Sequence, residues 1–146
     1  MLIEAKVKVS RIIDAKTKKK TETFILDREF FSQAEYDITA LLSQEVEQHT
    51  VESFDILSIK VSSVKEIYTE HQGESTFIAT FKDIFTDDNG KEKSIRYKIL
   101  LWANSLSEAN HKAYEIAHQG YSMTIEGINE VEYNYLPATN SEESSN

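Results

Sequence analysis

The sequence predicts an α+β fold of internally duplicated ββαβ units, with mixed, mostly antiparallel sheets and two helices packed on one side. Two observations carry this prediction. Residues 24–35 are similar to residues 99–110 at a constant offset of 75, and both stretches lead from a short apolar strand into a helical pattern. Both are also preceded by alternating apolar and polar residues, the period of a strand with one buried face. An internal duplication therefore sets the expected architecture.

The strands of the first copy are expected in three places. Apolar and polar residues alternate over residues 3–9, which predicts the first strand. A polar turn is expected over residues 14–20, and residues 21–26 are rich in β-branched and aromatic types, which predicts an antiparallel second strand. Residues 54–64 predict the third strand, reached by a right-handed crossover.

In the second copy the strands are expected over residues 77–81, 95–101 and 121–133. The Asn-Gly pair at residues 89–90 lies between the first two of them, and this pair is a strong short-range signal of a β-hairpin. The first strands of the two copies are related by an offset of 74, and the loops differ in length. An old duplication with insertions and deletions in loops explains both differences.

One helix is expected in each copy. Ser32 and Glu35 have the spacing of a capping box, so the first helix is expected to begin there and to end near residues 44–46. Ser107 occupies the corresponding position in the second helix, and Gly120 is placed to end that helix. The apolar positions of the first helix form one stripe, which consists of Ala34, Ile38, Leu41 and Leu42.

The chain length of 146 residues suits one sizeable core and is short for two ordinary domains. A single pseudo-symmetric domain is therefore expected over residues 1–136, with repeat one at residues 1–70 and repeat two at residues 75–136. Residues 137–146 form a polar, acidic tail that is predicted to be disordered.

Charge is distributed unevenly along the chain. Residues 1–20 contain seven of the 16 basic residues and two of the 25 acidic ones, a balance of +5, whereas the remainder balances at −14. Such an acidic bulk disfavours wholesale wrapping by nucleic acid and favours a basic partner. Cysteine is absent, and the start of the chain lacks an apolar signal core, so a cytoplasmic location is expected, in the host cell if a phage encodes the protein.

Three motifs of the chain can be compared with known families: the strand-to-helix segment at residues 26–35, the strand motifs at residues 58–60 and 66–67, and the loop at residues 89–93. Together they resemble an uncharacterised family, the domain of unknown function 4494 of Bacteroidetes and their phages. The resemblance covers residues 2–136. It implies a phage or mobile-element setting, and it offers no functional residue to carry across.

No catalytic constellation is found, so an enzyme, a cofactor and a metal site are not expected. His111, Glu115 and His118 share one face of the second helix, but a zinc site needs three or four convergent ligands with outer hydrogen bonds. That face points away from the apolar stripe, and a solvated polar surface explains it.

The basic first hairpin is the strongest candidate for ligand binding. Lys6 and Lys8 project from the same strand face, and four further lysines crowd the neighbouring turn, namely Lys16, Lys18, Lys19 and Lys20. Such a prong would suit phosphate groups. The alternative interpretation is an edge hairpin that its lysines protect from aggregation.

A second candidate surface lies around the single tryptophan. Arg96 and Lys98 alternate on the strand that leads to Trp102, and together they would line a small site for an anionic ligand. Tyr133 and Tyr135 share one face of the final strand and would extend this surface or form an edge for a partner strand. Core packing of the tryptophan and half-buried sheet tyrosines are the alternative.

Three functions remain open at this point. The favoured one is a non-enzymatic phage or mobile-element protein that binds a host or phage protein and inhibits a host or defence factor. The first alternative is a module for a nucleotide or single-stranded nucleic acid. The second is a small phage structural or assembly protein that forms a homo-oligomer. Contact with a membrane is not expected.

Overall fold

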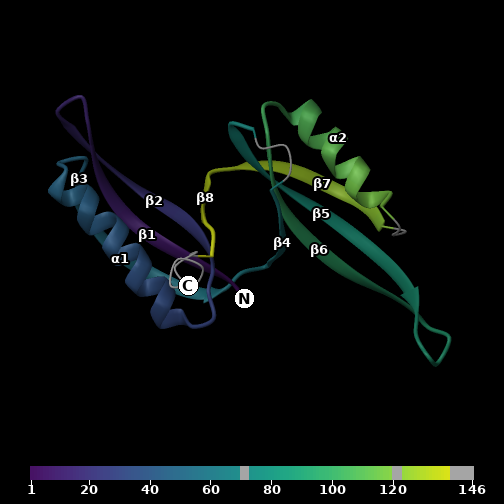
Figure 1. The fold of residues 1–146 in the computed structure, drawn as a ribbon. Helices are drawn as coiled ribbons and strands as arrows, with labels where there is room; N and C mark the ends of the chain where they lie inside the picture. Colours follow the sequence, from purple (N-terminus) through teal and green to yellow (C-terminus); the bar gives the residue numbers. More distant parts are fainter. Residues whose placement is uncertain (70–72, 120–122, 139–146) are drawn as a thin grey trace, which may run out of the picture. The chain divides into compact units, whose positions relative to one another are not determined.

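A computed structural model describes residues 1–69, 73–119 and 123–138 of the chain (Figure 1). They form two compact units. Unit 1 consists of residues 1–62 and the C-terminal part from residue 133, and unit 2 consists of residues 63–132. Each unit combines a four-stranded sheet with one helix, so the α+β class is confirmed.

Unit 1 contains β1 (Leu2–Ile13), β2 (Lys16–Asp27), α1 (Phe31–Glu47), β3 (Val51–Val61) and β8 (Tyr133–Leu136). Its sheet has the strand order β3-β1-β2-β8. The pairs β1–β2 and β1–β3 are antiparallel, and β8 is parallel to β2.

Unit 2 contains β4 (Val64–Tyr68), β5 (Ser75–Thr86), β6 (Glu92–Ala103), α2 (Leu106–Ala117) and β7 (Met123–Val131). Its sheet has the order β4-β6-β5-β7, with β5 antiparallel to β6 and β7, and β4 parallel to β6. Both units thus follow the order strand, strand, helix, strand, which is consistent with an internal duplication.

The fourth strand of each sheet follows the third strand of the other unit in sequence. β4 begins three residues after the end of β3 but pairs with β6, and β8 begins two residues after the end of β7 but pairs with β2. The predicted continuous strands over residues 54–64 and 121–133 are therefore wrong. Val64 and Tyr133 each begin a separate short strand, which supplies hydrogen-bond partners to an edge that would otherwise be open.

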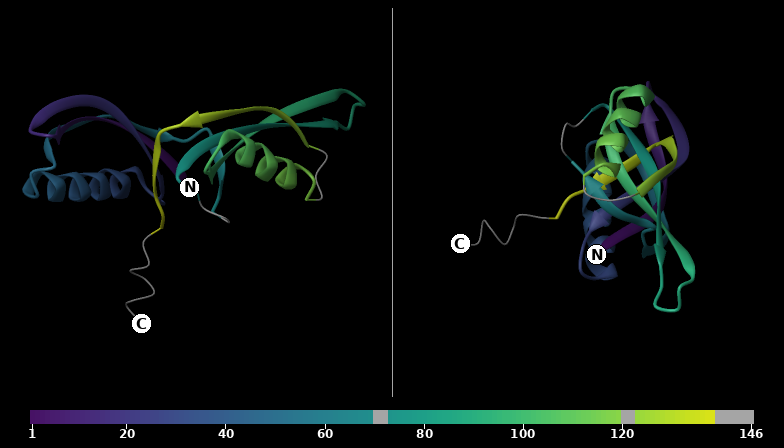
Figure 2. Two further views of the ribbon diagram at one scale, coloured as in Figure 1. Left: turned by 90° about the horizontal axis from the view of Figure 1, so that it is seen from above. Right: turned by 90° about the vertical axis from the view of Figure 1, so that its right-hand side faces the viewer.

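The core of unit 1 lies between its sheet and α1, which Figure 2 shows as a layer beside the strands. Alternate residues of β1 point to the helix and are fully buried, namely Ile3, Ala5, Val7 and Val9. The predicted helical stripe is confirmed, because Ala34, Ile38 and Leu42 are buried against these strands and Leu41 is partly buried there.

The core of unit 2 repeats this arrangement. Phe77 and Phe81 of β5 and Ile99 and Leu101 of β6 pack against the small face of α2, which presents Ala109, Ala113, Ile116 and Ala117. The predicted hairpin is confirmed, since Gly90 has a φ of 78° and Asp87 Oδ1 accepts hydrogen bonds from the main-chain N–H groups of Asn89 and Lys91.

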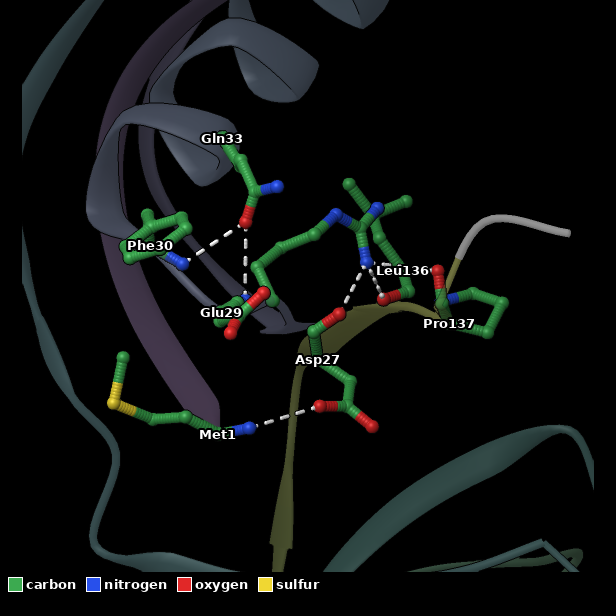
Figure 3. Close-up of polar contacts among 8 residues, drawn as sticks. Met1, Asp27, Glu29, Phe30, Gln33, Leu136 and Pro137 are labelled. Carbon is green, nitrogen blue, oxygen red and sulfur yellow. Dashed lines mark hydrogen bonds and ion pairs between the residues drawn. The ribbon is translucent and has the colours of Figure 1, made fainter. Parts of the chain in front are cut away.

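The ends of both helices differ from the prediction. α1 begins at Phe31, and the side chain of Gln33 accepts hydrogen bonds from the N–H groups of Glu29 and Phe30, so the predicted cap at Ser32 is wrong (Figure 3). α2 is capped by Ser105, whose hydroxyl oxygen accepts from the N–H of Glu108 at 3.1 Å. The predicted stop at Gly120 and residues 139–146 of the predicted tail lie outside the described residues.

The first turn is also shorter than predicted. Asp14 and Ala15 both have positive φ and form the whole connection between β1 and β2. This is the backbone geometry of a two-residue hairpin. The lysines expected in a loop therefore belong to β2, where neighbouring side chains point to opposite faces of the sheet.

Candidate functional site

A cleft opens in unit 2 between the sheet and the C-terminal end of α2. It has a volume of about 510 Å³, within the range of small-ligand sites. Its described lining residues come from all four strands and the end of the helix, and they are Glu66, Tyr68, Asp83, Ile95, Tyr97, Ile99, Ile116, Gln119 and Met123.

The cleft exists because α2 is short. α1 has 17 residues and α2 has 12, and the offset of 75 aligns the last residue of α2, Ala117, with Leu42. In unit 1 the helix continues from this point to Glu47, and Leu42 is fully buried. Unit 2 has an alanine at the equivalent place and no further turn of α2, so part of the sheet face stays uncovered.

An ion cluster occupies the corresponding place in unit 1. Arg11 Nε and Nη2 donate to the carboxylate of Glu22 at 2.5 and 2.6 Å, and Arg11 Nη1 lies 3.4 Å from Glu45 Oε1. The hydrogen bond to Glu22 raises the pKa of Arg11 above its usual range. At the offset of 75, Glu22 corresponds to Tyr97 and Lys20 to Ile95. Unit 2 thus has an apolar cleft where unit 1 has paired charges.

The chemistry of the cleft is apolar and acidic. Tyr97 Oη donates a hydrogen bond to Glu66 Oε2 at 2.8 Å, which holds one carboxylate at the wall. Asp83 lies opposite Ile95 in the β5–β6 ladder, on the same face of the sheet. The described lining contains these two carboxylates and no basic side chain. It is suited to a ligand that carries both an apolar part and a positive charge.

The structure separates the lysines of the first hairpin. Lys6 and Lys8 are exposed on the sheet face opposite α1, opposite Thr23 and Thr21 of β2. Lys18 and Lys20 lie on the other face, because they pair with Arg11, which contacts α1, and with the core residue Val9. The four predicted lysines therefore form two surfaces.

The sheet face that carries Lys6 also carries two tyrosines. Tyr133 lies beside Thr23, and Tyr135 lies beside Ile25, so β8 places both phenol rings on the sheet face opposite α1. Burial raises the pKa of Tyr133 and of Tyr135, and nearby carboxylates, Glu4 and Asp27 respectively, raise it further. Tyr133 and Tyr135 belong to the sheet of unit 1 and Trp102 belongs to the sheet of unit 2, so the extension of the Trp102 surface by these tyrosines stays a prediction.

Arg96, Lys98 and Trp102 lie on one face of β6, opposite the face that packs on α2. Arg96 Nε pairs with Glu126 Oε2 at 3.0 Å, and Trp102 is six positions further along the strand, a span of roughly 20 Å. These three side chains follow one another along an extended strand and therefore do not enclose a pocket for an anionic ligand.

The histidine face of α2 is exposed as expected. His111 Nε2 lies 3.3 Å from Glu115 Oε1, and the rings of Tyr114 and His118 are 4.9 Å apart. Among the residues that the structure describes, no group of three His, Asp or Glu side chains is arranged to hold a metal ion.

The cleft was not predicted from the sequence, although the two copies contain a signal for it. Comparing the copies position by position shows Leu42 replaced by Ala117, Lys20 by Ile95 and Glu22 by Tyr97. A large helical residue is lost where two polar strand residues become apolar. This pattern indicates an uncovered apolar surface in the second copy, but it has meaning only once the strands are known to face the helix.

The family described as "Domain of unknown function (DUF4494)" matches residues 1–135. The chain belongs to this family. The matched residues span both units and include β4 and most of β8, the strands that complete the two sheets. No curated protein and no solved structure matches the chain. Across the described parts of this DUF4494 member, no helix is both long and apolar enough to cross a membrane.

Proposed function

We propose that the protein is a non-enzymatic binding protein that acts through contact with another protein, and that the cleft of unit 2 receives part of that partner. The observation that carries the proposal is the composition of the cleft, with apolar walls and two carboxylates. An apolar side chain and a basic side chain of a partner would both be accommodated. Charge complementarity of this kind speeds association and excludes wrong partners.

The charge of unit 2 supports a basic partner. Residues 63–132 contain seven basic and twelve acidic residues, a balance of −5. Ile95 also lines the cleft with 54% of its surface exposed, so apolar surface is accessible to a partner there. A phage or mobile-element setting, a cytoplasmic location and inhibition of a host or defence factor remain predictions from the sequence.

An array of immobilised peptides, with and without basic and apolar residues, tests the proposal. Ile95→Arg should abolish binding, because it adds a large positive charge at the cleft. The matched control is Ile84→Arg, since Ile84 is 47% exposed on the opposite face of the same hairpin. Peptides that combine apolar and basic residues should bind the control variant normally. Equal loss in both variants, or binding that ignores peptide charge, would contradict the proposed site.

One observation favours a second candidate function, the binding of a single-stranded nucleic acid by unit 1. Tyr133, Thr23 and Lys6 lie in one row across the open sheet face. An aromatic ring beside exposed lysines is the arrangement that stacks bases and contacts phosphates. Acidic neighbours weigh against it, because Glu4 lies in the adjacent row, with Lys60 Nζ 3.7 Å from its carboxylate.

Binding of a labelled oligonucleotide at low salt, measured for two double variants, decides which of the two lysine surfaces contacts it. If the open face binds it, Lys6→Glu combined with Lys8→Glu should remove binding. The double substitution of Lys18 and Lys20 by glutamate makes the same change of charge on the other face and should weaken binding only slightly. Affinity should also fall steeply as salt rises. Equal effects of the two double variants would indicate non-specific attraction.

A further inference from the structure

We infer that the cleft of unit 2 recognises an arginine side chain of the partner, and that Asp83 is the residue that binds its guanidinium group. This inference rests on the proposed function, and it names both the residue type of the partner and the carboxylate that receives it. The evidence is the position of Asp83 in the sheet, its unpaired carboxylate, and the apolar and aromatic side chains around it.

Asp83 occupies a core position of the strand pattern. Every second residue of β5 faces α2, and Phe77, Ala79 and Phe81 are buried on that face. Asp83 is the next residue of this series, and it lines the cleft between the sheet and the helix. At the offset of 74 that relates the first strands of the two copies, Asp83 corresponds to Val9, which is fully buried in the core of unit 1. Unit 2 thus has a charge where unit 1 has an apolar core residue.

The strand register supports this correspondence. Asp83 pairs with Ile95 in the β5–β6 ladder, and Val9 pairs with Lys20 in the β1–β2 ladder. Ile95 and Lys20 are themselves related by the offset of 75. On its other side, Asp83 lies opposite Met123 of β7. Since Ile95 and Met123 both line the cleft, Asp83 has an apolar neighbour on each adjacent strand.

The carboxylate of Asp83 is available to a ligand. Among the residues that the structure describes, it takes part in no hydrogen bond and no ion pair. Asp83 is half-buried, so the protein removes part of its water without supplying a donor. The other carboxylate of the cleft differs, because Glu66 accepts a hydrogen bond from Tyr97 Oη at 2.8 Å. A cation bound at Asp83 would supply the missing partner.

The surroundings favour a guanidinium group over an ammonium group. Tyr68 and Tyr97 line the cleft, and the hydrogen bond to Glu66 holds the phenol of Tyr97 at the wall. A guanidinium group is planar and weakly hydrated, and it stacks on aromatic rings, whereas an ammonium group is compact and strongly hydrated. It also forms two parallel hydrogen bonds with one carboxylate. The arginine head would therefore contact Asp83, and its methylene stem would lie against the apolar wall.

Replacing Asp83 with valine separates binding from stability. The substitution restores the residue type of the equivalent position in unit 1, and valine suits a strand better than aspartate does. Asp83→Val should therefore raise the melting temperature and abolish the binding of arginine peptides, as expected for a residue that serves function at a cost in stability. A lower melting temperature would show that the carboxylate supports the fold, which would contradict the inference.

Three fluorescent peptides test the recognition of arginine. Each has a leucine and a serine on both sides of a central residue, which is arginine, lysine or citrulline. Citrulline has nearly the shape of arginine but carries no charge. The arginine peptide should bind about tenfold or more tightly than the citrulline peptide, because a hydrogen bond between charged groups is lost. The lysine peptide should bind with intermediate affinity.

Asp83→Asn should remove this preference. It should weaken binding of the arginine peptide by about tenfold and leave binding of the citrulline peptide unchanged. The matched control is Glu126→Gln, which makes the same change of charge in the same sheet. Glu126 pairs with Arg96 on the face opposite α2, so the control should bind the arginine peptide as the unmodified protein does.

Separate outcomes distinguish the arginine site from the cleft as a whole. If Ile95→Arg removes binding of the arginine peptide but Asp83→Asn does not, the proposed function stands and the assignment of Asp83 is wrong. Equal loss in Asp83→Asn and Glu126→Gln would indicate general attraction of charge and would overturn the inference. It is also overturned if the arginine and citrulline peptides bind equally or if neither binds, while the peptide array still decides the proposed function.

Discussion

Lys112 Nζ donates a hydrogen bond to the main-chain oxygen of Trp102 at 2.7 Å, although only 6% of Lys112 is exposed. Glu108 pairs with the same ammonium group at 3.1 Å. At the offset of 75, Trp102 corresponds to Asp27, whose main-chain oxygen accepts from Arg28 Nη1 at 2.8 Å. Each unit therefore places a buried or nearly buried cation on the carbonyl at the end of its second strand.

The two units reach this arrangement with different residues. In unit 1 the cation follows the strand, and its carboxylate partner is Asp37 of α1, with Arg28 Nε 2.5 Å from Asp37 Oδ2. In unit 2 the cation is on the helix, at the position that corresponds to Asp37. The sign of the charge at this position therefore differs between the units, yet the main-chain oxygen has a cationic donor in both, because a buried carbonyl oxygen needs a donor.

Replacing Lys112 with methionine should lower the free energy of unfolding by roughly 1–3 kcal/mol, because the carbonyl of Trp102 loses a charged donor. Urea unfolding followed by the fluorescence of Trp102, the single tryptophan, measures this change. Lys98→Met is the matched control, since Lys98 is exposed on β6. Equal stability of the two variants would show that the buried contact contributes nothing.

The pKa of Glu108 provides a pH-dependent test. The hydrogen bond from Lys112 is the main cause that lowers this pKa, and the N–H of Asn104 lowers it further. Lys112→Met should therefore raise the pKa of Glu108 toward its ordinary value. Because the folded-state pKa is lowered, the contribution to stability is present above the unfolded-state pKa and is lost as the pH falls through the folded-state value. Carbon-13 NMR of the carboxyl group measures the change.

Arg28 should determine how firmly β8 is attached to unit 1. Its Nη1 donates to the oxygens of Pro137 at 2.9 Å and Leu136 at 3.4 Å, both shown with Asp27 and Met1 in Figure 3. Lysine cannot reproduce this fork of donors. Arg28→Lys should therefore destabilise the protein by about 2 kcal/mol and speed amide exchange in β8.

The control for this test is Arg96→Lys, which makes the same substitution at an exposed arginine. It should change stability by no more than about 0.5 kcal/mol, since exposed ion pairs contribute little. If amide hydrogen exchange in β8 is equally fast in both variants, backbone pairing with β2 alone holds the strand in place.

Two glycines should respond oppositely to alanine. A Cβ at Gly73 would lie 2.4 Å from the main-chain carbon of Ala103, a contact that backbone atoms cannot relieve easily. Gly73→Ala should destabilise the protein by roughly 1–3 kcal/mol. A Cβ at Gly127 meets no described atom within 4 Å, so Gly127→Ala should leave the melting temperature unchanged or raise it slightly. A tolerated alanine at residue 73 would contradict the close approach.

The sequence by itself determined the features that depend on neighbouring residues. The alternation in β1, the stripe of Ala34, Ile38 and Leu42, and the hairpin at Gly90 were all predicted and are confirmed. Each arises from the period of 2 or 3.6 residues, or from a local backbone requirement. The repeated strand, strand, helix, strand order follows from the same local patterns.

Only the tertiary structure decided which strand completes which sheet. Val64 and Tyr133 each continue an apolar pattern in sequence, yet both begin strands that pair in the other unit's sheet. Pairing between distant segments depends on which edge has unsatisfied hydrogen-bonding groups, a property that no local window contains.

The candidate site follows from the same kind of non-local arrangement. The cleft depends on where α2 ends relative to Ile95 and Tyr97, and the separation of Lys6 from Lys18 depends on which face of the sheet α1 covers. The sequence shows the type of each residue. It does not show which residues are neighbours in space, because side chains far apart in sequence come together only when helix and sheet pack.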